Sequence, residues 1–320
     1  MKKFLAWFLV WMSIPLVSAY VVDYMVSSGL RKTDLRKYAV WNDIYGKKIN
    51  ADVVVIGSSR AWCGYNTYIL DSLLHCNSYN LGIDGHNFEM QNIRYATYRR
   101  YNKKPKVVIV NADYVSTLGI TADPRYEREQ FFPYIWDDSL ISAVKEMKEI
   151  SFWDRFIPLL RYFGYRNELE DGISSFFGKT VFDDGGMYKG YRGNDYLWQS
   201  MELPKKEEQG VMRVVYDLKK ADALDAFVRK ACEEGIKVVL VKSPVCSSFY
   251  QLSDTHISDS VFERISYRYR VPILNYYTSD VSMDSTNFYN YTHLNKKGSD
   301  LFTLKLCHDL DSLGIMASTE

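Results

Sequence analysis

Short apolar runs alternate with amphipathic segments along most of this chain, a rhythm typical of a parallel sheet covered by helices. Runs rich in β-branched residues predict five buried strands, at 52–56, 78–81, 106–111, 236–241 and 271–275. Apolar residues at helical spacing predict helices at 66–76, 87–101, 211–234, 259–269 and 296–313. Because strands and helices alternate, we expect an α/β domain in which right-handed crossovers join parallel strands.

Residues 115–210 interrupt this rhythm with loops, glycines and aromatic residues. The aromatic residues gather at 131–136, 152–153, 176–177 and 188–198. We interpret the region as an insertion of short helices and loops over the C-terminal edge of the sheet. Insertions of this kind form lids and substrate walls, but a simple packing extension fits the pattern equally well.

The N-terminus carries an uncharged apolar run from Phe4 to Val22, after Lys2 and Lys3. About 20 apolar residues in a helix span the core of a bilayer, so we favour an uncleaved transmembrane anchor over residues 1–25. The alternative is a cleavable signal peptide, since the small residues at 17–19 resemble a cleavage site. Under either interpretation, we expect the rest of the chain to be exported to the periplasm or the cell surface. A basic connector would follow at 26–50 and the α/β domain at 51–320.

Composition narrows the classes of function. Hydrophobic residues make up 47% of the 320 residues, enough for a large core, and the net charge of +1 gives no overall nucleic-acid footprint. The five cysteines are widely spaced without a CxxC motif, which argues against a zinc site. We expect buried free thiols, although one disulfide could form in an oxidising compartment. The sequence suggests neither a metal nor an organic cofactor.

Two segments far apart in the sequence could supply a nucleophile and its base. The first strand ends in Gly57-Ser58-Ser59, which would place the Ser59 hydroxyl at the C-terminal edge of the sheet. His293 lies in a loop just before the last helix. If the sheet brings them together, Ser59 is the nucleophile and His293 the general base. Otherwise the serines cap the turn or form a backbone anion site, and His293 is structural.

These motifs together resemble the SGNH (GDSL-like) hydrolase superfamily, in its membrane-anchored cell-envelope branch. The first block reads Gly57-Ser58-Ser59-Arg60, the second Asn80-Leu-Gly-Ile-Asp-Gly85, and the last Asn290-Tyr-Thr-His293 followed by Leu-Asn-Lys-Lys-Gly. The resemblance covers about residues 50–115 and 235–313. It implies a flavodoxin-like three-layer α/β/α sandwich, catalysis by Ser59 and His293, and an oxyanion hole formed by the Ser59 amide and Gly85.

The chain departs from the family pattern at two positions. The third block normally offers an oxyanion-hole asparagine, and Asn111 is the nearest match here. The aspartate that orients the histidine is replaced by Asn290, which can accept a hydrogen bond but supplies no negative charge. Asp284 is the closest upstream acid that could substitute. Arg60 could clamp an anionic group of the substrate, or could cap the following helix and face solvent.

Two functions of different classes follow. The first is a membrane-tethered, extracytoplasmic serine esterase or O-acyltransferase, which the resemblance directs to acyl or acetyl esters of envelope glycans. The second is a catalytically impaired relative that binds polysaccharide or docks a membrane acyltransferase, and Asn290 favours it. We favour the enzyme because the serine, glycine and histidine blocks are all present. Whether water or a sugar hydroxyl accepts the acyl group is not encoded in these motifs.

Overall fold

The computed structural model describes residues 2–119, 127–146, 150–182, 187–198, 212–213, 215–251 and 253–316. The chain forms two compact units, each built from two separate segments. The N-terminal unit comprises Met1–Gly46 and Pro124–Asp184. The sheet unit comprises Lys47–Asp123 and Gly185–Glu320. Most of the predicted insertion therefore groups with the N-terminal helices, while residues 187–198 belong to the sheet unit; the predicted domain bounds themselves stay a prediction.

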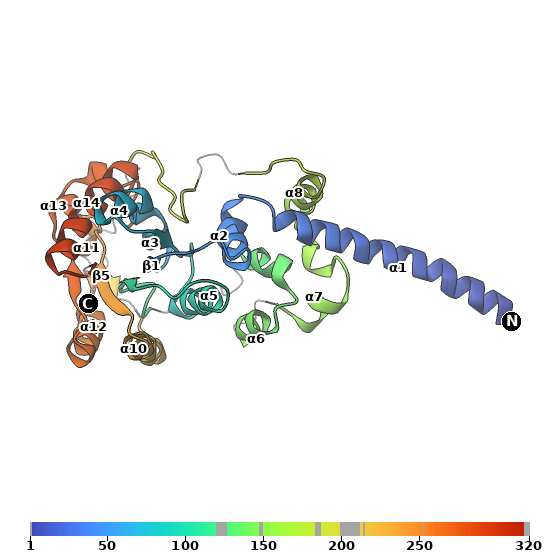
Figure 1. Cartoon of the computed structure of the whole chain (residues 1–320), viewed down its shortest axis with the longest axis horizontal. Coiled ribbons are helices and arrows are strands. Elements are labelled where there is room, and N and C mark those ends of the chain that lie inside the picture. Colours follow the sequence, from blue (N-terminus) through green and yellow to red (C-terminus); the bar gives the residue numbers. More distant parts are fainter. Residues whose placement is uncertain are drawn as a thin grey trace. The chain divides into compact units, whose positions relative to one another are not determined.

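A parallel sheet of five strands forms the centre of the sheet unit (Figure 1). Its strands lie in the order β2-β1-β3-β5-β7, with the bounds Ser78–Asn80, Val53–Ile56, Val107–Asn111, Lys237–Lys242 and Ile273–Asn275. This order, in which the second strand flanks the first on one side and later strands follow on the other, is the flavodoxin-like arrangement. The predicted α/β fold is confirmed. Ligands of such sheets bind at the carboxyl ends of the strands where the order reverses, here between β1 and β3.

Helices cover both faces of this sheet. One group contains α3, α4 and α14, and the other contains α5, α10 and α12; Figure 1 shows α4 and α14 on one side of the strands and α10 and α12 on the other. The bounds are Ser59–Gly64, Thr67–Leu74 and Lys296–Ser312 for the first group, and Phe88–Tyr101, Leu218–Glu233 and His256–Tyr269 for the second. The shorter helices are α11 at Ser247–Tyr250, α13 at Asp280–Met283 and η3 at Ser285–Asn287.

The long helix predicted at 211–234 begins later than its apolar pattern indicates. Asp217 accepts a hydrogen bond from the Lys219 amide at 3.0 Å and caps α10 at Leu218. Upstream of the cap, β4 at Met212–Arg213 pairs in parallel with β6 at Ser253–Asp254. The prediction was therefore wrong at that end, because a local capping residue overrides a continuous hydrophobic pattern.

The core of the sheet unit is formed by the apolar runs that predicted its strands. Val53, Val55, Ile109 and Val239 are buried beneath Phe302 of α14. All five cysteines are unpaired thiols; Cys63, Cys246 and Cys307 are buried, and Cys76 and Cys232 are half-buried. The prediction of free thiols is confirmed.

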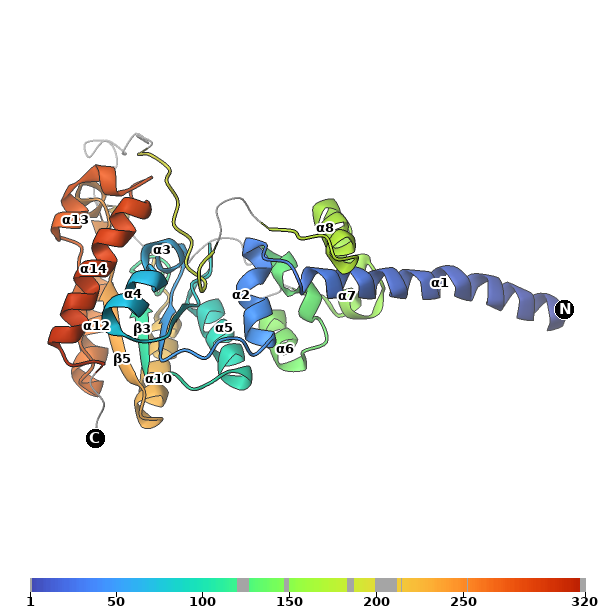
Figure 2. The same cartoon turned by 45° about the horizontal axis from the view of Figure 1, so that its top comes forward.

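The N-terminal unit consists of helices around the end of α1, which runs from Lys2 to Leu30 (Figure 2). The others are α2 at Arg36–Tyr45, η1 at Arg128–Tyr134, α6 at Asp138–Glu146, α7 at Phe152–Phe156, η2 at Leu160–Tyr162 and α8 at Arg166–Phe176. A Cβ atom on Gly29 would lie 1.7 Å from the Gly172 carbonyl oxygen, so α1 and α8 pack with their backbones in contact. The predicted connector thus begins with the packed last turn of α1.

One described helix is long and apolar enough to cross a membrane, with its best window at Val10–Leu30 and a mean hydropathy of 1.3. The last third of α1 is tied to the N-terminal unit by an ion pair between Asp23 and Arg161, both buried. Arg161 also donates to the Ser27 hydroxyl at 3.0 Å. Between residues 10 and 21 the side chains of α1 are exposed apart from Ala19, and Tyr24, just after Asp23, is exposed as well.

Candidate active site

Ser59 lies at the turn between β1 and α3. A Cβ atom on Gly57 would lie 2.6 Å from the Ala61 Cβ and 2.7 Å from the Asn111 Cβ, so only glycine allows this close approach. Ser58 caps α3 by accepting a hydrogen bond from the Arg60 amide. Ser59 is then the first residue of the helix and is half-buried. The amides of Ala61 and Trp62 also bond to Ser58, through its carbonyl, so the Ser59 amide is the donor of this first turn that is left beside the hydroxyl.

His293 lies in the loop between η3 and α14. The loop is closed by a bridge between Phe288 and Leu294, and Asn295 caps α14 by accepting from the Gly298 amide at 3.0 Å. The Ser59 Oγ lies 2.7 Å from the His293 Nε2. The two residues are 234 positions apart in the sequence. The structure therefore brings together the pair that the sequence motifs singled out.

Asn290 holds the other side of the imidazole. Its Oδ1 lies 2.9 Å from the His293 Nδ1 and also accepts hydrogen bonds from the backbone amides of His293 and Thr292. An amide oxygen accepts only, so Nδ1 carries the proton and Nε2 is left to accept from the Ser59 hydroxyl. The Thr292 Oγ1 lies 3.0 Å from the same Nδ1. The arrangement is a Ser-His-Asn triad, and Thr292 is a neighbour that the sequence motifs did not reveal.

The electrostatics of the site keep the imidazole neutral. Burial, and to a lesser degree the nearby Arg60 guanidinium, lower the pKa of His293 to about 4. Asp84 and Asp113 act in the opposite direction but do not offset this effect. A neutral imidazole at pH 7 is the form that can remove a proton from a hydroxyl.

Asn111 is placed at the end of β3, with its side chain against Gly57. Its Oδ1 accepts a hydrogen bond from the Tyr65 hydroxyl at 2.8 Å. The side chain is buried, and its Nδ2 has no hydrogen-bond partner among the described residues. A buried donor without an acceptor costs about 1–3 kcal/mol, so its retention indicates a use that the resting structure does not satisfy.

The second sequence block supports α3 through Asn80. Its Nδ2 donates to the Ala61 carbonyl at 2.8 Å and its Oδ1 accepts from the Gly82 amide at 2.9 Å. A Cβ atom on Gly82 would lie 2.5 Å from the Trp62 nitrogen, so the loop packs directly on the helix that carries Ser59. Gly85 follows in the same loop, exposed and in a left-handed conformation with φ of +69°. Its oxyanion role stays a prediction.

Arg60 does not occupy either position that the sequence suggested. It is buried, and its guanidinium pairs with Asp113 at 2.7 Å and donates to the Ser243 carbonyl at 2.6 Å. Burial alone would lower the pKa of Arg60, but the Asp113 carboxylate outweighs it and raises that pKa further above neutrality. The solvent-facing cap was therefore wrong. Arg60 holds the start of α3 to the loops after β3 and β5, and we no longer assign it to the substrate.

Asp284 does not replace the missing acid of the triad. Its Oδ1 caps η3 by accepting from the Thr286 amide at 2.9 Å, and its Oδ2 lies 3.3 Å from the Lys297 Nζ. The described contacts of the His293 Nδ1 are instead Asn290 and Thr292. Asp284 is a structural residue on the surface.

Aromatic side chains surround the histidine. Tyr289 stacks on His293 with ring centroids 5.4 Å apart, and Tyr196 packs edge-on against Tyr289 at 6.1 Å. Trp198 contacts Tyr291 in the same way at 5.1 Å. The aromatic run at 188–198 was visible in the sequence, but its position beside the last loop was not. The end of this run forms a wall next to the loop that carries His293.

Cys63 is the thiol carried by the same short helix as Ser59. Burial, with a smaller contribution from the Asp84 carboxylate, raises the pKa of Cys63 to about 12. Because the thiolate is the reactive form of cysteine, this thiol is inert at neutral pH. Within α3, Ser59 is therefore the residue poised for nucleophilic attack.

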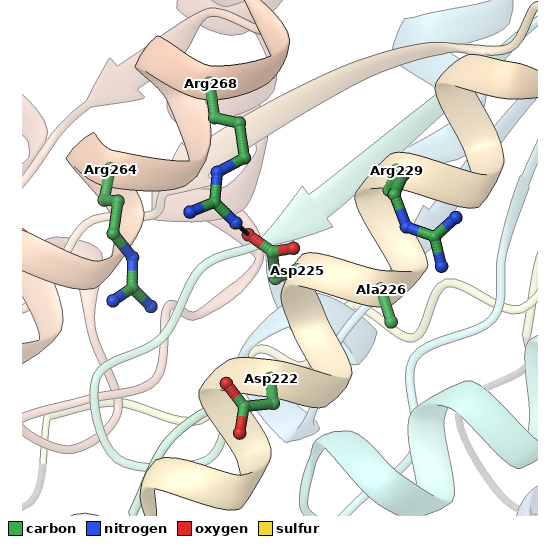
Figure 3. Close-up of a pocket in the computed structure, with 6 residues that line it drawn as sticks. All are labelled: Asp222, Asp225, Ala226, Arg229, Arg264 and Arg268. Carbon is green, nitrogen blue, oxygen red and sulfur yellow. Dashed lines mark hydrogen bonds and ion pairs between the residues drawn. The ribbon is translucent and has the colours of Figure 1, made fainter.

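A separate charged pocket of about 290 Å³ lies between α10 and α12 (Figure 3). It is lined by Asp222, Asp225, Ala226, Arg229, Arg264 and Arg268. Its charges pair locally, as between Arg268 and Asp225 at 2.8 Å. No residue of the Ser-His-Asn triad lines this pocket, so it is not the candidate active site.

Comparisons with known proteins found a similar solved structure and no matching family. No known protein family matches the chain, and no curated protein matches it. Among solved structures, the chain is similar to one from Bacteroides fragilis described as a "putative acylhydrolase", with 11% sequence identity and a TM-score of 0.37. The match covers 82% of this chain and 86% of that chain. At this identity and TM-score it carries no argument about activity, which must be argued from the geometry of the site.

Proposed function

We propose that the protein is a serine hydrolase or O-acyltransferase of the SGNH type, anchored to a membrane with its sheet unit outside the cytoplasm. The proposal depends above all on the 2.7 Å contact between the Ser59 Oγ and the His293 Nε2, with Asn290 behind the imidazole. A hydroxyl at the start of a helix, a neutral imidazole and a buried unpaired amide are the parts that ester cleavage requires.

The reaction would begin when the Ser59 hydroxyl attacks the carbonyl carbon of an ester while His293 takes its proton at Nε2. The carbonyl oxygen becomes an oxyanion, which the backbone amides of Ser59 and Gly85 and the Asn111 Nδ2 would stabilise. The intermediate expels the alcohol, which receives the proton from His293, and leaves an acyl group on Ser59. Water or a second hydroxyl then attacks this ester, with His293 again acting first as base and then as acid.

We further propose acyl or acetyl esters of cell-envelope glycans as substrates. The aromatic wall formed by Tyr196, Trp198, Tyr289 and Tyr291 supports this choice, because aromatic rings stack against the apolar faces of sugars and bury them at little entropic cost. The exposed apolar part of α1 supports a location at the membrane, where envelope polymers are assembled. A transferase would differ from an esterase only in admitting a sugar hydroxyl as acceptor.

The second candidate function is a non-catalytic protein that binds polysaccharide or docks a membrane acyltransferase. Asn290 favours it, because an amide does not stabilise the imidazolium that forms during catalysis. Losing that charge lowered turnover about 10⁴-fold in a serine protease. The retained hydrogen bonds at both imidazole nitrogens favour the enzyme.

A fluorophosphonate probe on the full-length protein separates the two functions. We expect covalent labelling of the wild type and complete loss in Ser59→Ala, because only an activated serine attacks the phosphorus. Ser58→Ala is the matched control; it removes a neighbouring hydroxyl that caps α3 and should leave labelling in place. Equal labelling of wild type and Ser59→Ala, or no labelling of correctly folded wild type, would contradict the enzyme.

A further inference from the structure

An exposed set of aromatic and aliphatic side chains lies beside α1 in the N-terminal unit. We call it the aromatic collar, and it consists of Trp136, Phe152, Trp153, Phe156, Ile157 and Phe163. Phe163 is 87% exposed and Trp153 is 60% exposed. Proteins rarely leave a contiguous apolar patch of this kind in water, and when they do it marks an interaction surface.

Four rings of the collar contact one another and so form one surface. Phe152 packs against Trp153 and Phe156 with ring centroids 5.4 and 4.6 Å apart, and Trp136 lies edge-on to Phe156 at 6.3 Å. The Arg155 guanidinium covers the Trp136 ring at 4.9 Å. Helix α7 thus presents apolar rings with a cation among them, which is the composition of segments that lie in a membrane interface.

A hydrogen bond fixes the level of the collar along α1. The Tyr20 hydroxyl donates to the Phe156 carbonyl at 2.7 Å. The described apolar side chains that are exposed before Asp23 lie between Phe4 and Val21, and at 1.5 Å per residue that length is about 27 Å, close to the thickness of a hydrocarbon core. Tyr20 therefore lies at the end of this apolar stretch, at the depth where a bilayer meets its headgroups.

One turn further along the same face of α1, Tyr24 contacts a second group of aromatic residues. Tyr24 packs edge-on against Phe176 at 6.5 Å, and Phe176 contacts the exposed Phe177. Aromatic residues gathered at one level near the end of a membrane-spanning helix are typical of the belts that transmembrane proteins place at the interface. The buried ion pair of Asp23 with Arg161 lies at the same level, one residue before Tyr24.

We propose that the aromatic collar is a membrane-interface surface, which inserts α7 and its neighbours into the headgroup region around the outer end of α1. This inference rests on the membrane anchoring in the proposed function but not on catalysis. The occupant is the lipid bilayer itself, because the collar is continuous with the helix face that would cross it. The N-terminal unit would then contact the bilayer through the collar as well as through α1, which would restrict its rotation relative to the membrane.

Quenching of tryptophan fluorescence by brominated phosphatidylcholine tests the collar in the full-length protein reconstituted into vesicles. Trp7 and Trp11 lie in the span and are first replaced, giving Trp7→Phe/Trp11→Phe as the background. We expect brominated lipid to quench the tryptophan fluorescence of this background variant. Most of that quenching should disappear when Trp136→Phe and Trp153→Phe are added to the variant. The matched control adds Trp198→Phe, a change in the sheet unit, and should keep the quenching.

Two results would contradict the membrane-interface role of the aromatic collar without contradicting the membrane anchor. In the first, brominated lipid quenches the fluorescence of the wild type but not that of the Trp7→Phe/Trp11→Phe variant. The other is quenching that survives removal of Trp136 and Trp153. A second copy of the chain or another protein on the collar would give the first result, with blue-shifted emission. Failure of wild type to be quenched would contradict the anchor and the collar together, and fluorophosphonate labelling would still test the enzyme separately.

Discussion

Asn290 performs the positioning task of a triad acid without its charge. Its Oδ1 accepts the imidazole N–H and two backbone amides, so the side chain both orients His293 and holds the turn that carries it. The positions of Ser59 and His293 could be predicted because a strand end and a helix start mark them in the sequence. The contacts of Thr292 and Tyr289 with the imidazole could not, since they depend on how this one loop turns. The role of Asn80 could not either, since it depends on how a loop from another part of the chain packs against α3.

Restoring the acid should increase activity and shift its pH dependence. Because burial lowers the pKa of His293 to about 4, wild-type kcat/KM should stay constant from neutral pH downward and fall only as pH drops through about 4. In Asn290→Asp the carboxylate favours the imidazolium, so we expect that fall at a pH higher by about 1–3 units and a kcat at pH 7 raised about tenfold or more.

Ester turnover measured from pH 3 to 8 checks both effects. Asp284→Asn is the matched control, because it changes an acid of the same loop region that does not contact the imidazole, and it should leave the profile unchanged. A kcat in Asn290→Asp at or below that of wild type would show that charge behind His293 is not what limits the reaction.

The unpaired Asn111 amide gives a second test at this scale. If Nδ2 serves the oxyanion, Asn111→Ala should lower kcat by about 10²–10³ with little change in KM. Tyr65→Phe removes the hydroxyl that contacts Asn111 Oδ1 but leaves Nδ2, so its effect should be much smaller. Steady-state kinetics on folded variants compares them. Equal, few-fold losses in both variants would assign Asn111 to packing alone.

Among the elements, those with long apolar patterns could be predicted and those fixed by single contacts could not. The five strands follow directly from β-branched runs such as Val53–Ile56. Helix α3, by contrast, has only six residues, too few for a hydrophobic period to appear. Its position depends on Arg60, whose buried ion pair with Asp113 links it to the end of β3. An arginine after a serine motif looks like a ligand-binding residue in sequence, because nothing local indicates its burial.

The Arg60–Asp113 pair should matter greatly for stability. Asp113→Asn leaves a buried guanidinium without its counter-charge, and we expect the free energy of unfolding to fall by about 3–5 kcal/mol. Glu233→Gln is the control, because it breaks the exposed Arg229–Glu233 pair on α10 and should cost at most about 0.5 kcal/mol. Denaturant unfolding of the full chain measures both. Similar small losses in the two variants would mean that Arg60 finds other partners.

At the scale of the whole chain, the two units interleave. The N-terminal unit takes Met1–Gly46 and Pro124–Asp184, and the sheet unit takes the two segments between and after them. Hydrophobic patterning predicted the sheet because each of its strands carries its own run of apolar residues, even though the segment at 124–184 separates β3 from β5. It did not predict the partnership of residues 124–184 with α1, since that depends on distant contacts such as Gly29 with Gly172. Loops and short helices give no periodic signal for such pairing.

The ion pair of Asp23 with Arg161 has a consequence for biogenesis. Its two members are 138 positions apart, so a ribosome adding about 5–20 residues per second delivers the arginine on the order of ten seconds after the aspartate. In the membrane-anchored protein that we propose, the apolar helix is therefore inserted while its carboxylate has no counter-ion yet. Docking of the segment that carries Arg161 then neutralises that charge, so this later docking step, and not insertion, ties the helix to the N-terminal unit.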